Sequence, residues 1–103
     1  MDSLKTYLSN LQNKIFKLLP MKEAHNAGEN IHLSEYLINL CSNFDGAFAF
    51  YPELSEVREI VEVRNNVEFL KNEIDLDFKR WRAIVLRSTR LVHDTLERYM
   101  KEV

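Results

Sequence analysis

The chain has 103 residues and a formal net charge of −2, and its apolar and charged side chains make up 46% and 29% of the sequence. This composition excludes a disordered tail, and the length suits one folded domain, residues 1–103. With two glycines and two prolines the chain has too few turn residues for a β-sandwich or barrel, and its slightly negative charge gives no general attraction to nucleic acid.

The first predicted helix covers residues 3–19. Its apolar residues recur at alternating steps of four and three, which is the spacing of an amphipathic helix with one buried side. Pro20 disfavours the α conformation in Leu19, so we expect the helix to end there. The polar stretch of residues 20–30 is predicted to be a loop with at most one helical turn. The apolar stripe consists of Leu4, Leu8, Leu11, Ile15 and Leu18.

The second predicted helix covers residues 32–50 and stops before Pro52. Gly46 lies inside it, although glycine costs a helix about 1 kcal/mol relative to alanine. We therefore expect Gly46 and Ala47 to form a small patch that lets another helix approach closely. The apolar stripe consists of Leu33, Leu37, Leu40, Phe44, Ala47 and Tyr51.

The third and fourth predicted helices cover residues 54–74 and 77–102. Asn65 and Asn66 lower helix propensity in the third, so an interruption there is left open. The fourth would be about 39 Å long at a rise of about 1.5 Å per residue, longer than the first helix can cover. Part of it would then be free to pair with another chain.

These four apolar stripes predict an all-α fold. Because the connections are short, successive helices should be antiparallel neighbours in an up-down four-helix bundle. The same spacing also suits coiled-coil seams, and a chain this short buries only part of its surface on folding. A bundle completed or extended by dimerisation is therefore an alternative that the sequence leaves open.

The N-terminal residues and the single cysteine bear on the location of the protein. Residues 1–7 lack the basic and apolar regions of a secretory signal, and the longest apolar run, Ala47 to Tyr51, is far too short to span a bilayer. Cys41 has no second cysteine to pair with and no zinc-ligand spacing around it. We predict a cytoplasmic protein without a cofactor or membrane association.

The last predicted helix carries the strongest charge asymmetry of the sequence. It has no acid between residues 78 and 93, whereas residues 53–75 carry seven acids and three bases. At about 100° per residue, four of its cations fall on the side opposite Trp81. We call these residues the basic strip: Lys79, Arg80, Arg87 and Arg90.

Two interpretations of the basic strip differ in partner. In the first, the strip is a solvated surface that pairs with the acidic third helix within one chain or between chains. The glutamates available for such pairs are Glu56, Glu59, Glu62 and Glu68. In the second, the strip contacts phosphates, and the protein is a nucleic-acid-binding regulator.

The segment from Arg87 to Asp94, Arg-Ser-Thr-Arg-Leu-Val-His-Asp, resembles the arginine-to-histidine motif near the end of HEPN domains. These are small helical bundles that often dimerise and include metal-independent ribonucleases. The resemblance implies His93 as general acid or base, with Arg87 or Arg90 stabilising charge on a phosphate. Ser88 stands where that family commonly has asparagine.

The remaining candidates are ligand and contact residues. His32 and Glu35 share a helical face, but no third ligand completes a metal site. Phe50 and Tyr51, beside a proline at a helix end, should be partly exposed and available to a partner. We therefore predict a non-enzymatic interaction or adaptor protein, a homodimer that acts through helix faces, with Phe50, Tyr51 and the basic strip as contact residues. A HEPN-like ribonuclease or toxin-type protein is the enzymatic alternative.

Overall fold

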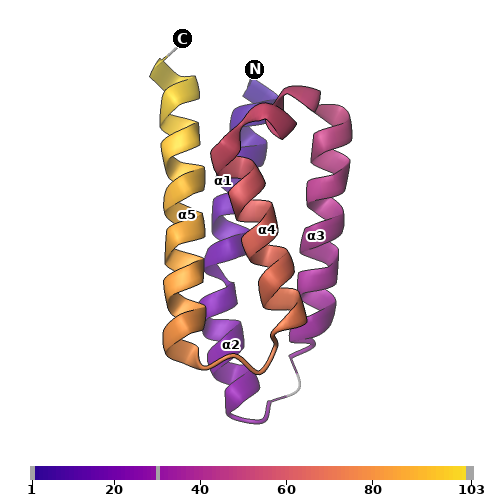
Figure 1. Cartoon of the computed structure of the whole chain (residues 1–103), viewed down its shortest axis with the longest axis vertical. Helices are drawn as coiled ribbons and strands as arrows, with labels where there is room; N and C mark the ends of the chain where they lie inside the picture. Colours follow the sequence, from indigo (N-terminus) through magenta and orange to yellow (C-terminus); the bar gives the residue numbers. More distant parts are fainter. Residues whose placement is uncertain (1, 30, 102–103) are drawn as a thin grey trace.

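The structure, a computed structural model, describes residues 2–29 and 31–101, and every regular element in these ranges is a helix. Four long helices pack against one another, and in Figure 1 the chain descends through the first, ascends through the second, descends through the third and ascends through the last. The elements are α1 (Asp2–Phe16), α2 (Leu18–Asn26), α3 (Leu33–Phe50), the 3-10 helix η1 (Pro52–Glu56), α4 (Arg58–Asn72) and α5 (Phe78–Lys101).

The first part of the chain departs from the prediction around Pro20. The helix breaks after Phe16, four residues before Pro20. It then resumes as α2, which runs past the proline to Asn26. A proline ring clashes with the carbonyl four residues before it, which explains the break after Phe16. Pro20 itself lies in the first turn of α2, where a missing N–H costs nothing. The predicted loop over residues 20–30 is therefore wrong for most of its length.

Gly28 ends α2. The N–H of Glu29 donates to the carbonyl of Ala24 and the N–H of Gly28 donates to that of His25, each at 3.0 Å. This pair of bonds is a Schellman cap, which needs a left-handed residue, and Gly28 supplies it with a φ of 84°. The chain then turns back into α3, which begins within one residue of its predicted start.

The predicted third helix divides into two elements. η1 covers Pro52–Glu56, Val57 is extended with φ −86° and ψ 104°, and α4 begins only at Arg58. α4 then runs unbroken through Asn65 and Asn66, so the interruption that the sequence left open does not occur there. The amide of Asn66 donates to the Ser88 hydroxyl of α5 at 3.1 Å, which offsets its low helix propensity.

α5 agrees with its predicted start within one residue, and residue 102 lies outside the described residues. The carboxylate of Asp77 accepts a hydrogen bond from the backbone N–H of Arg80 at 3.1 Å and so caps the helix. α5 packs against α1, α2 and α4, and α4 lies between α3 and α5. Apolar side chains from every helix join one core, with Trp81 and Val85 of α5 among its fully buried members.

Candidate functional site

The basic strip lies on the outward side of α5, and all four of its side chains are exposed. Arg80 pairs with Asp77 of the preceding turn, Nε to Oδ1 at 3.4 Å. Arg87 reaches across to α4, where its guanidinium makes two hydrogen bonds to the Glu62 carboxylate. The strip is thus partly occupied by acids of the same chain.

The predicted pairing of the basic strip with the acidic helix occurs at Glu62, and a second glutamate pairs with an arginine outside the strip. The hydrogen bonds from Arg87, together with its charge, lower the pKa of the Glu62 carboxyl and raise the pKa of the Arg87 guanidinium. Glu59 pairs with Arg98, Oε2 to Nη2 at 2.8 Å, although Arg98 is not a member of the strip. These bonds join α4 to α5 along their exposed edge.

The residues that resemble the HEPN motif lie on one helix, and two of them are paired with glutamates. His93 is half-exposed, and its Nε2 lies 3.2 Å from the Glu97 carboxylate one turn further along α5. Arg87 is held on another flank of the helix by Glu62. Arg90 is exposed on the outward side, one turn before His93. The helix thus presents His93 beside an acid on an open surface.

Phe50 and Tyr51 differ in their surroundings. The Phe50 side chain is 75% exposed, the largest value among the exposed large apolar residues, and it packs edge-on against Tyr51 with ring centres 4.8 Å apart. Tyr51 is half-buried between α3 and α1, where its hydroxyl donates to the Ser3 hydroxyl at 2.9 Å. Phe50 projects into solvent, whereas Tyr51 bridges two helices.

Three more large apolar side chains are exposed on separate helices. They are Phe16 (53%), Ile38 (53%) and Phe69 (45%). Each of them lies outside the periodic apolar stripe of its helix. A large apolar residue outside the stripe is the sequence signal for such an exposed side chain.

One cation, which the sequence does not predict to be buried, lies in the core. Lys22 of α2 is 1% exposed, its ammonium donates to the backbone carbonyl of Ile74, and it lies 4.8 Å from the centre of the Trp81 ring. Burial lowers the pKa of Lys22, while the charges of Asp75 and Asp77 act in the opposite direction. The position follows Leu18 by four residues, so it continues into α2 the apolar stripe of the first predicted helix. This cation fixes α2 to the connection before α5.

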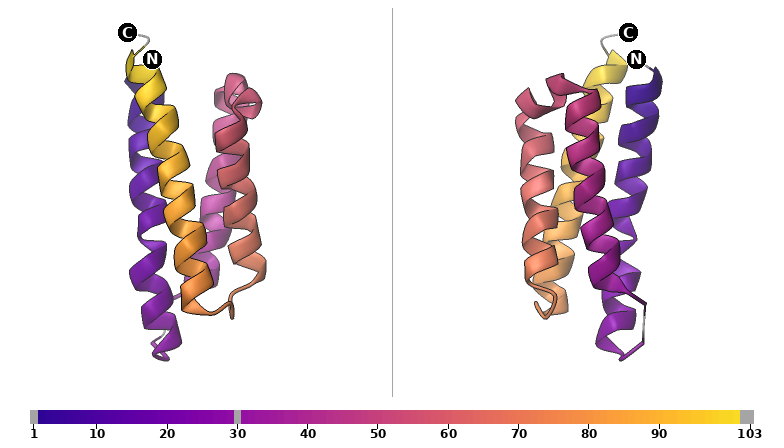
Figure 2. Two further views of the ribbon diagram at one scale, coloured as in Figure 1. Left: turned by 60° about the vertical axis from the view of Figure 1, so that its left-hand side comes forward. Right: turned by 90° about the vertical axis from the view of Figure 1, so that its right-hand side faces the viewer.

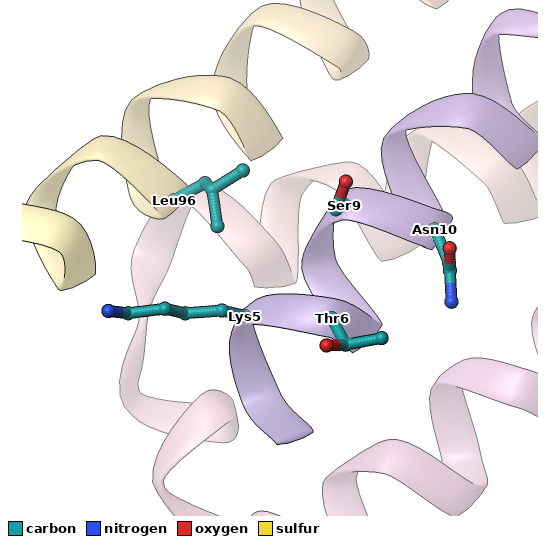
Figure 3. A pocket seen from close by; sticks show the side chains of 5 residues that line it. All are labelled: Lys5, Thr6, Ser9, Asn10 and Leu96. Atoms are coloured by element: carbon teal, nitrogen blue, oxygen red, sulfur yellow. The ribbon is translucent and has the colours of Figure 1, made fainter. Parts of the chain in front are cut away.

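Two surface depressions on the described part of the chain are shallow. One, of about 380 Å³, lies beside α1 with Leu96 of α5 at its edge, and Figure 3 shows that its polar side chains Lys5, Thr6 and Asn10 point in different directions. The other, of about 240 Å³, lies between α1 and α3. Ligand pockets need polar groups that converge, and the first depression has no such arrangement.

The candidate ligand and nucleophile residues are also separate. His32 lies 3.6 Å from Glu35, and within residues 2–29 and 31–101 no group of three His, Cys, Asp or Glu side chains is placed to hold a metal ion. Cys41 is half-buried, and burial raises the pKa of its thiol, which keeps it protonated at neutral pH.

Comparison with models of known protein families, with curated proteins and with solved structures finds no match to this chain. None of the helices in the described part of the chain is both long and apolar enough to cross a bilayer. Functional inference therefore depends on the surface of the protein itself.

Proposed function

We propose that this protein is an antiparallel up-down four-helix bundle that acts as a non-enzymatic interaction protein in the cytoplasm, and that it associates with itself as a homodimer. The observation that carries the proposal is the exposure of Phe50, at 75% of its side chain. Burying a phenylalanine stabilises a complex by roughly 1.5–3 kcal/mol, so an exposed one at a helix end favours association.

The charged residues support contact rather than chemistry. Arg87 and Arg80 are held by carboxylates of the same chain, and His93 lies beside Glu97. A ribonuclease of the HEPN type would use a histidine and an arginine that face one scissile phosphate. The observed pairings of Arg87 and His93 give that alternative no support.

Light scattering coupled to size-exclusion chromatography tests the proposal. The full chain should change from a monomer to a dimer as its concentration rises from about 1 to several hundred micromolar, the range of a modest interface. A mass that stays at the monomer value of 12.2 kDa at every concentration would contradict self-association.

A further inference from the structure

The outward side of α3 carries little charge beyond Glu35 in its first turn. Figure 2 (right) shows α3 in front, with no other helix covering this side. From Ile38 to Phe50 its exposed residues include one charged side chain, Asp45, and that carboxylate pairs with Arg64 of α4 at 3.2 Å. We call the central residues the α3 face: Ile38, Ser42, Gly46, Ala49 and Phe50.

Gly46 in the middle of this face has no packing partner within the chain. A Cβ added to Gly46 would meet nothing within 4 Å. Of the patch expected from the sequence, Ala47 is buried in the core, whereas no helix in the described part of the chain closely approaches Gly46. Because glycine costs a helix about 1 kcal/mol relative to alanine, the intramolecular structure gives no reason for it. The absence of a side chain at Gly46 would let a helix of another chain approach the backbone closely.

Four residues of the α3 face follow one another at steps of four: Ile38, Ser42, Gly46 and Phe50. Residues spaced in this way form one continuous ridge on a helix surface. The two large side chains are at its ends and the two small ones at its centre, over a length of about 18 Å. The ridge is therefore symmetric in size about the midpoint between Ser42 and Gly46.

This symmetry is what a two-fold contact between identical helices requires. When two copies of α3 run antiparallel, Ile38 of one copy lies opposite Phe50 of the other, and Ser42 lies opposite Gly46. The small central pair lets the two backbones approach closely, and the large pairs close the ends. Ridges of this spacing align when two helices cross at about −50°.

Charge favours the α3 face over the outward side of α5 for a contact between identical chains. In a two-fold contact a surface meets itself, so a surface of one sign repels its own copy. The outward side of α5, with Lys79 and Arg90, would meet the same cations. The α3 face brings no unpaired charge to such a contact.

We propose that the α3 face binds the α3 face of a second copy of this chain, with the two helices antiparallel and crossing at the midpoint between Ser42 and Gly46. This inference rests on the proposed function and assigns the surface through which self-association occurs. The contact buries Ile38 and Phe50, two of the large apolar side chains that the monomer leaves exposed.

A matched pair of arginine substitutions tests the assignment. Gly46→Arg places charge and bulk at the centre of the α3 face, and Ala83→Arg adds the same side chain to the exposed side of α5. Dimer dissociation constants are measured by sedimentation velocity, and melting by circular dichroism confirms that each variant folds. We expect at least a hundredfold weaker dimer for Gly46→Arg and less than a threefold change for Ala83→Arg.

Each result has a defined meaning. If the wild type dimerises and Gly46→Arg dimerises equally well, the assignment to the α3 face is wrong while self-association stands. If the wild type is monomeric at every concentration, both proposals fail. A dimer weakened equally by both variants would likewise remove the assignment, since it would indicate a general effect of added charge.

Disulfide cross-linking supplies a second measurement that does not depend on Gly46→Arg folding. In a Cys41→Ala background, chains carrying Ile38→Cys are mixed with chains carrying Phe50→Cys and mildly oxidised. The antiparallel register predicts cross-links between the two kinds of chain. Ile38→Cys alone should give none, because the two copies of residue 38 would be about 18 Å apart and a disulfide needs Cα atoms within about 7 Å. Cross-linking of Ile38→Cys with itself would overturn the register.

Discussion

The ammonium of Lys22 lies over the ring of Trp81, 4.8 Å from its centre, and both side chains are buried. The indole N–H of Trp81 donates in turn to the backbone carbonyl of Leu18 at 3.0 Å. The two residues come from opposite ends of the chain, and their contacts hold α2 against the start of α5. An aromatic ring attracts a cation, which offsets part of the cost of burying one.

Truncating Lys22 tests how much of this contact is packing. Lys22→Ala removes a long buried side chain and the hydrogen bond to Ile74, so we expect it to lower the free energy of unfolding by about 2–4 kcal/mol. Lys22→Met keeps most of the volume without a buried charge and should stay within about 1 kcal/mol of the wild type. Urea unfolding at pH 7 measures both. A Met variant as unstable as the Ala variant would show that the charge itself stabilises the fold.

Tyr7 carries a buried hydroxyl with no hydrogen-bond partner among the described residues. An unsatisfied polar group of this kind costs about 1–3 kcal/mol, and Phe has the same ring without it. We therefore expect Tyr7→Phe to raise the free energy of unfolding by about 1 kcal/mol at pH 7. Thermal and urea unfolding check this; a less stable variant would show that the hydroxyl makes a favourable contact in solution.

The same residue predicts a loss of stability in alkali. Burial raises the pKa of Tyr7 from 10.0 to about 12, so between these pH values the folded chain binds more protons than the unfolded chain. The raised pKa of Tyr7 therefore leaves the free energy of unfolding unchanged below pH 10 and lowers it as the pH rises toward 12. Urea midpoints of the wild type should decline more steeply across this range than those of Tyr7→Phe. Parallel curves would argue against the raised pKa.

The two glycines should respond to alanine with opposite signs. Gly46 is helical with open space around it, so Gly46→Ala should stabilise the monomer by about 0.5–1 kcal/mol. Gly28 has a φ of 84°, which strains any residue with a Cβ, and Gly28→Ala should destabilise the chain by about 1 kcal/mol or more. Denaturation at a concentration where monomers dominate measures both changes. Destabilisation by Gly46→Ala would indicate a contact at residue 46 within the monomer.

The enzymatic and nucleic-acid alternatives are tested together on a labelled single-stranded RNA at low salt without metal. We expect no cleavage and no shift in mobility, because His93 and Arg87 are held by different carboxylates. Cleavage that disappears in His93→Ala would establish the ribonuclease. Binding without cleavage that weakens steeply with salt and is lost in Arg90→Glu would establish the regulator instead.

The positions of the helices are predictable because they depend on the spacing of apolar residues along each segment. Apolar residues at steps of three and four place α3 and α5 within one residue of their starts. The prediction at Pro20 is wrong because a proline breaks the interior of a helix but is accepted in its first turn. The sequence does not show that a new helix begins two residues before Pro20. The turn at Val57 has no comparable signal in the sequence.

The candidate surface was less predictable because it depends on which sides the neighbouring helices cover. The exposure of Phe50 is predictable from its place beside a helix end. The exposure of Ile38 depends on how α1 and α4 pack against α3. Likewise, a lysine is buried at position 22 because Ile74 and Trp81 meet there. The spacing of apolar residues within a segment does not determine which distant segment it contacts.

The packing of α1 against α5 has a consequence for how the chain folds during synthesis. In the described part of the chain α1 precedes the other helices and α5 follows them, so the principal neighbour of α1 leaves the ribosome after all of them. Until then the leucines of α1 lack most of their final cover, and closing the whole chain carries the entropy cost of a long loop. A nascent chain halted before α5 would therefore expose an apolar helix surface to chaperones.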